Sequence, residues 1–146
     1  VKGAAQIGSW LGSFAVHGKT IRDVFRLEPG RITISGKELP WESNNGISCS
    51  SMEKLGLGFT PYPRANEEPG KFQAAALRIK VGDFIRLMWH YKRGRVPDHP
   101  DQINTITDHV RLEAENAVSY VVDGEIYEGT NQLEVRTGPG LDLILA

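Results

Sequence analysis

Several short segments of the chain alternate apolar and polar residues, a pattern typical of strands with one buried face. Glycines and prolines separate these segments, as they do in antiparallel sandwiches and barrels. We therefore predict an antiparallel β-sandwich whose strands share one interior. The residues expected to face that interior are Ile32, Ile34, Leu77, Ile79, Val110, Leu112, Leu133, Val135 and Leu143. The run Ala117–Val122 is apolar without alternation, so we expect it to be covered on both faces.

Two other segments have helical rather than strand periodicity. The first places Ala4, Ile7, Trp10, Leu11 and Phe14 on one stripe, and the second does the same with Phe84, Leu87, Met88 and Tyr91. For the second helix we expect Asp83 as the N-cap and Gly94 as the stop. Strands and helices do not alternate along the chain, so the pattern does not favour a parallel nucleotide-binding sheet.

Composition narrows the class of protein. A chain of 146 residues has room for a single domain, taken here as residues 1–146, and its net charge of −1 does not suggest a nucleic-acid partner. The single cysteine, Cys49, excludes an internal disulfide and fits a reducing, cytoplasmic location. We expect Cys49 to be a small buried strand residue rather than a nucleophile. The chain begins with Val1 and has its first methionine at Met52, so we expect either a processed start or a piece of a longer protein.

The strongest turn signal is Asp123-Gly124, which stands between two apolar segments. This dipeptide favours a two-residue hairpin turn, because both central residues must accept a positive φ. Glu125 follows directly, and a carboxylate fixed beside a rigid turn is what a general base requires. Two interpretations stay open at this point: a hairpin alone, or a hairpin that positions a base.

Two further segments carry charges that chemistry could use. In the loop 61–72, Glu67 and Glu68 offer oxygen ligands, but two adjacent glutamates make a poor metal cage, and we predict no metal site. The segment Trp89–Arg95 is basic and aromatic, which fits a solvated basic face or a contact with anionic lipid headgroups. The four histidines lack the spacing of a zinc site.

Three motifs in order resemble the C-terminal part of the diacylglycerol-kinase-like lipid kinases, a group that includes sphingosine kinases and bacterial lipid kinases. The first is the glycine-rich turn 56–61 followed by Pro63-Arg64-Ala65. The second is the helix that ends at Gly94, followed by the proline-containing connection 96–100. The third is Val122-Asp123-Gly124-Glu125, which resembles the family's Asp-Gly-Glu box, with the family's last strands behind it. The resemblance spans residues 31–146.

The resemblance implies a β-sandwich second domain that carries the lipid side of a kinase cleft. Glu125 would be the general base that takes the proton of a lipid hydroxyl, with ATP and Mg²⁺ bound in the parent protein. The partners would be a lipid substrate, the membrane surface and a nucleotide-binding domain. That domain and its Gly-Gly-Asp-Gly motif are absent from this sequence, so we expect no cofactor to be bound by this fragment alone. Pro69 stands where the family has a metal-linked aspartate, which argues against a structural Mg²⁺ in this loop.

Two other functions compete with the kinase hypothesis. The chain could be a non-enzymatic β-sandwich module that binds a lipid or a protein partner, with Asp-Gly-Glu as a plain hairpin. It could also be a regulatory or scaffolding domain that keeps the lipid cleft without kinase activity.

Overall fold

The computed structural model describes residues 25–54 and 60–139. The predicted N-terminal helix, the glycines at 56–58 and the closing leucines all lie outside the described residues. The elements are β1 (Glu28–Ile34), β2 (Lys37–Glu38), β3 (Ser43–Asn44), β4 (Gly46–Ser50), β5 (Phe72–Leu77), α3 (Val81–Tyr91), β6 (Gln102–Thr107), β7 (His109–Val122) and β8 (Glu125–Arg136).

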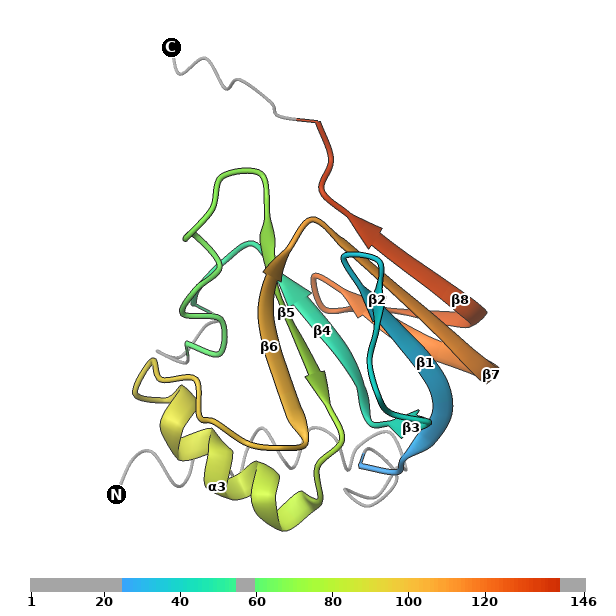
Figure 1. Ribbon diagram of the computed structural model, residues 1–146, viewed down its shortest axis with the longest axis horizontal. Helices are drawn as coiled ribbons and strands as arrows, with labels where there is room; N and C mark the ends of the chain where they lie inside the picture. The colour runs from blue at the N-terminus through green and yellow to red at the C-terminus, as the bar shows by residue number, and fades with distance from the viewer. Residues whose placement is uncertain (1–24, 55–59, 140–146) are drawn as a thin grey trace.

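The strands form two antiparallel sheets (Figure 1). One sheet has the order β2-β1-β7-β8, with β3 paired to the beginning of β1, and the other has the order β4-β5-β6. The chain passes from one sheet to the other at Asp108, the single residue between β6 and β7. The predicted antiparallel β-sandwich is confirmed.

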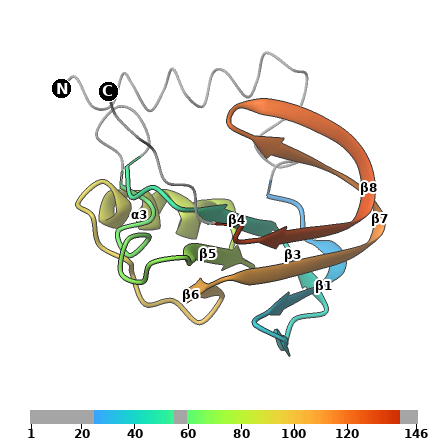
Figure 2. The same ribbon diagram turned by 90° about the horizontal axis from the view of Figure 1, so that it is seen from above.

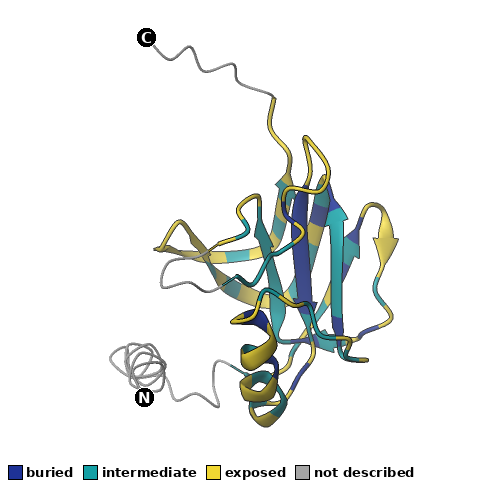
Figure 3. Cartoon of the chain, turned by 90° about the vertical axis from the view of Figure 1, so that its left-hand side faces the viewer, coloured by how far each residue is buried: buried dark blue, intermediate teal, exposed yellow. Residues whose placement is uncertain are grey.

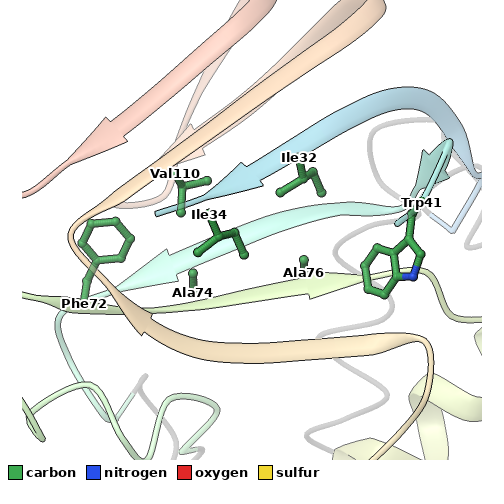
Figure 4. Close-up of a cluster of buried hydrophobic side chains, with 7 residues drawn as sticks. All are labelled: Ile32, Ile34, Trp41, Phe72, Ala74, Ala76 and Val110. Atoms are coloured by element: carbon green, nitrogen blue, oxygen red, sulfur yellow. The ribbon is translucent and has the colours of Figure 1, made fainter. Parts of the chain in front are cut away.

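The two sheets meet at a core of small and branched apolar side chains (Figure 4). Ile32 and Ile34 of β1 are buried because the alternation of that strand points both toward the second sheet. Strand β5 contributes Phe72 and the small side chains of Ala74 and Ala76 to the same core. The buried members of this cluster are Ile32, Ile34, Trp41, Phe72, Ala74, Ala76 and Val110, with Leu112 and Val135 packed against it.

The expectation of one shared interior is wrong for Leu77 and Ile79. Strand β5 ends at Leu77, and Val81 already begins α3. Between these two elements, the backbone N–H of Ile79 donates to the side-chain oxygen Asn45 Oδ1 at 2.6 Å and not to a neighbouring strand. Ile79 is consequently buried in a second, smaller core beneath the helix. That core contains Ile79, Leu87 and Tyr91, with Leu77 and Phe84 packed against them.

Helix α3 is confirmed, but its predicted cap is not. The N-cap residue is Lys80, and no side chain caps the helix there. Asp83 lies inside the first turn, where it forms a 3.8 Å ion pair with Arg86. Gly94 follows the helix with a φ of 64°, and its N–H donates to the carbonyl of Tyr91, as expected of a stop residue.

The hairpin of β7 and β8 has two parts in different surroundings. Its near part lies in the sheet beside β1, where Val110 pairs with both Ile34 and Val135. Its far part, from 115 to 131, extends beyond every other described strand and bends away from the sheets (Figures 2 and 3). The expectation that Ala117–Val122 is covered on both faces is wrong, because four of its six residues are exposed and the other two, Val118 and Tyr120, are half-buried. No helix within the described ranges has both the length and the apolarity to span a membrane.

Candidate functional site

The tip of the β7–β8 hairpin is the two-residue turn that the sequence predicts. Val122 pairs with Glu125 across it, and the two residues between them have positive φ angles, 50° at Asp123 and 90° at Gly124. These angles are those of the primed turns that match the right-handed twist of a hairpin. The turn places Glu125 at the first position of β8. The backbone of this residue is thus fixed by the ladder on one side and by the turn on the other.

The side chain of Glu125 is exposed, and a neighbouring tyrosine holds one of its oxygens. Tyr127, two residues along the strand and on the same face, donates its hydroxyl to Glu125 Oε2 at 2.9 Å. The ring of Tyr127 stacks on Tyr120 with centroids 5.2 Å apart. The hydrogen bond to Glu125 raises the pKa of the Tyr127 hydroxyl above its ordinary value, because it stabilises the protonated phenol. Among the described residues, no group hydrogen-bonds to the other oxygen, Glu125 Oε1.

Exposed apolar side chains lie on both faces of the hairpin tip, with Val122 on the face of Glu125 and the pair Val121 and Ile126 on the opposite face. Val121 and Ile126, which pair across the hairpin, are 64% and 61% exposed, and Val122 is 50% exposed. Large apolar side chains gathered at one place on a surface mark a site that contacts something apolar. Sequence reasoning found the turn and the carboxylate but missed this surface. The signal was the unalternating run Ala117–Val122, which is equally consistent with a strand buried on both faces and a strand exposed on both.

The acidic loop does not join this site. The single N–H of Arg64 Nε donates to both carboxylate oxygens of Glu67, each 2.9 Å away, and this interaction lowers the pKa of the Glu67 carboxyl. Glu68 pairs with Lys71 at 2.6 Å. Both carboxylates are thus neutralised by cations of their own loop, and Pro69 offers no ligand atom, so these residues do not fit a structural Mg²⁺. Within residues 25–54 and 60–139, no three His, Cys, Asp or Glu side chains form a metal-binding group.

Cys49, His109 and His99 lie outside the hairpin tip, and each has contacts that fit a role in the fold. Cys49 lies on β4, half-buried against the main core, and burial raises the pKa of its thiol to about 12. A thiol with so high a pKa is a poor nucleophile at neutral pH. His109 forms a 2.7 Å ion pair with Glu134 when protonated. His99 Nδ1 accepts the N–H of Asp101 in a turn.

Comparison with known proteins identifies the fold. No protein-family model matches the chain, and no curated protein is significantly similar to it in sequence. Two solved structures of a putative diacylglycerol kinase from Bacillus anthracis str. Sterne match 75% of the chain, with TM-scores of 0.60 and 0.57 and identities of 16% and 17%. A third, of a diacylglycerol kinase from the same organism, matches 90% of the chain with a TM-score of 0.55 and 15% identity.

The chain spans only part of each matching structure, between 36% and 44% of its length. It therefore has the fold of one portion of these proteins.

Proposed function

We propose that this chain is the lipid-substrate domain of a diacylglycerol-kinase-like lipid kinase and that Glu125 is its general base. One observation carries the proposal: a carboxylate is held beside a rigid turn, at a hairpin tip whose apolar side chains are exposed. The fold shared with diacylglycerol kinases supports it. The chain covers less than half of those proteins, so the nucleotide would be bound elsewhere.

A lipid alcohol combines a hydroxyl group with acyl chains, and the hairpin tip offers a group suited to each. The side chain of Val122 and the stacked rings of Tyr120 and Tyr127, which share the face of Glu125, would contact the acyl portion. Glu125 would then accept the hydroxyl proton while the lipid oxygen attacks the γ-phosphorus of ATP and ADP leaves. Phosphoryl transfer depends mainly on positioning and charge stabilisation, and a carboxylate that orients the attacking hydroxyl is a recurring part of it.

Tyr127 would act as a positioning residue in this scheme. Its hydroxyl hydrogen-bonds to Oε2, and a carboxylate held at one oxygen presents the other in a defined direction. The stacking on Tyr120 fixes the ring that makes this bond.

The test is Glu125→Gln in a preparation that combines this chain with a diacylglycerol-kinase nucleotide-binding domain. Glutamine keeps the size of the side chain and can still accept the Tyr127 hydrogen bond, but it is not a base. We expect turnover of diacylglycerol in mixed micelles to fall by about 10²–10⁴-fold, with the KM for ATP nearly unchanged.

Glu128→Gln is the matched control, because Glu128 is an exposed glutamate on the same strand. It should leave turnover within about twofold of the unmodified protein, as expected of a residue outside the reacting geometry. Equal turnover in the two variants would exclude Glu125 as the base. The domain would then be better described as a non-enzymatic lipid- or partner-binding module.

A further inference from the structure

Helix α3 carries an apolar pair on the side that the core does not use. Its inner side buries Leu87 and Tyr91 in the second core. On the outer side, Ile85 and Trp89 are each 58% exposed (Figure 3). These two residues are four apart, so they lie next to each other on the helix surface. Such a pair is a surface that another apolar segment can cover.

The described part of the chain begins beside this helix. The ring centres of Phe25 and Phe84 are 4.7 Å apart, and the carbonyl of Phe25 accepts a 2.8 Å hydrogen bond from Asn45 Nδ2. Phe84 immediately precedes Ile85 in α3. The 24 residues that precede Phe25 are therefore attached to the fold close to the exposed pair.

The segment 1–24 has a sequence that suits an apolar surface of this kind. Its large apolar residues follow helical spacing, and no charged residue stands from Gly3 to Val16. Gly8 and Gly12 lower the helix propensity of the segment, so a helix here requires packing against another element. The large apolar residues are Ile7, Trp10, Leu11 and Phe14.

The connection between this stripe and Phe25 is long enough to reach any part of α3. Residues 18–24 can extend to about 24 Å, since an extended chain spans at most about 3.3–3.6 Å per residue. Helix α3 has 11 residues and is therefore about 16 Å long. The stripe can thus lie along the outer side of α3 while Phe25 keeps its contacts.

The charges around the exposed pair are compatible with such a contact. Lys92 Nζ and the guanidinium of Arg93 lie 5.4 Å and 5.7 Å from the centre of the Trp89 ring. An uncharged stripe does not repel these cations, and both can remain in solvent at the edge of the contact.

We propose that residues 4–17 form an amphipathic helix that docks on the outer side of α3 and covers Ile85 and Trp89. The large apolar side chains of the segment contact this pair, while Ser9 and Ser13, on the opposite side of the same helix, face solvent. The contact is driven by removing two apolar surfaces from water.

This inference goes beyond the proposed function, since it assigns an intramolecular partner to α3. It does not depend on Glu125. Its test measures the reactivity of a thiol and involves no phosphorylation, so either proposal can fail while the other stands.

The experiment measures the rate at which N-ethylmaleimide modifies a thiol on α3 in the full 146-residue chain. The reporter is Ile85→Cys, and the matched control is Ile126→Cys, because Ile126 has a similar exposure of 61%. Both carry Cys49→Ala, which removes the natural thiol. We expect Ile85→Cys to react about tenfold more slowly, which corresponds to a segment docked for about nine-tenths of the time. The cations near position 85 favour the reactive thiolate, so electrostatics alone would give the opposite order.

The apolar stripe is then disrupted in the same full chain. Leu11→Asp, Phe14→Asp should raise the rate at position 85 by about tenfold and leave the rate at position 126 within about twofold. Ser9→Asp, Ser13→Asp is the matched control, because it adds the same charges on the polar side, and it should leave both rates unchanged. Circular dichroism and thermal unfolding confirm that each variant is folded. Trp89→Cys is the second reporter on this side if Ile85→Cys does not fold.

Protection that is independent of protein concentration and is lost only with Leu11→Asp, Phe14→Asp supports the proposal. The proposal is overturned if Ile85→Cys reacts as fast as Ile126→Cys, or if both pairs of aspartates raise its rate equally. It is also overturned if protection increases with protein concentration, because a second copy of the chain would then cover the helix.

Discussion

The near and far parts of the β7–β8 hairpin differ in burial although they share the same two strands. In the near part Val110 is 1% exposed, and in the far part Val121 of the same strand is 64% exposed. Both valines pair across the hairpin with a branched apolar residue, Val135 and Ile126 respectively. The backbone ladder therefore does not account for the difference.

What separates the two parts is the second sheet. Val110 faces Phe72 and the alanines of β5, whereas no described strand beyond β8 lies beside Val121. A paired strand satisfies its backbone hydrogen bonds but buries side chains only when another layer covers it. The uncovered part of the hairpin contributes little to the core and is free to carry a site.

The largest expected effect is on the free energy of unfolding, when the same valine-to-alanine substitution is made in the near and the far part of the hairpin. Val110→Ala removes two buried methyl groups and leaves a cavity, so we expect it to lower the free energy of unfolding by about 2 kcal/mol. Val121→Ala should change it by no more than about 0.5 kcal/mol. Urea titrations of both variants provide the measurement. Similar costs would mean that the far part of the hairpin is packed against something in solution.

Near pH 10, a smaller effect on the free energy of unfolding is expected from Cys49, which packs against the main core. The folded-state pKa of the Cys49 thiol is about 12 against an ordinary value of 9.0, because burial disfavours the thiolate. Between these values the unfolded chain releases a proton that the folded chain keeps, so stability falls as pH rises, by at most about 1.4 kcal/mol per pH unit. Burial raises the pKa values of Tyr62 and Tyr91 too, which acts in the same direction.

The thiol contribution can be isolated with Cys49→Ala. The free energy of unfolding of this variant should decline less steeply above pH 9 than that of the unmodified protein. Identical slopes would show that the thiol is not shielded by the sandwich.

The smallest effect is expected at the hairpin tip, where a hydrogen bond, and not mainly burial, raises the pKa of the Tyr127 hydroxyl. Glu125→Gln replaces the charged acceptor of the Tyr127 hydroxyl with a neutral one, so the pKa of Tyr127 should fall toward its ordinary value. Ultraviolet titration of tyrosinate absorbance, with Tyr127→Phe to identify the signal, provides the measurement. A pKa of Tyr127 that does not move would mean that the two side chains are not bonded in solution.

Much of the local structure was predictable from the sequence. The alternation in β1 fixes which side of the strand carries Ile32 and Ile34, and Asp123-Gly124 admits a primed turn, because these are properties of a few adjacent residues. The stripe that includes Leu87 and Tyr91 likewise predicts the buried side of α3. The candidate base, Glu125, follows from its place after the turn.

Strands whose buried residues are polar were not predictable in this way. Strand β6 buries Gln102 and Thr107, and Gln73 of β5 is completely buried. Gln73 is accommodated because its Oε1 accepts the N–H of Arg64 at 2.9 Å and its Nε2 donates to Asn104 Oδ1 at 3.2 Å. These partners are 9 and 31 residues away along the chain, so no local pattern reveals them.

Local patterns predict the strands with clear alternation, the turn at Asp123-Gly124 and the inner side of α3, since each depends on residues close together in the chain. Tertiary packing was needed to show that Ile79 belongs to a second core, that Val121 and Ile126 are exposed at the hairpin tip, and that Ile85 and Trp89 are exposed on α3. An apolar residue carries the same local signal whether or not a layer covers it. Coverage depends on which distant segments pack against it, and this is settled when the whole chain folds.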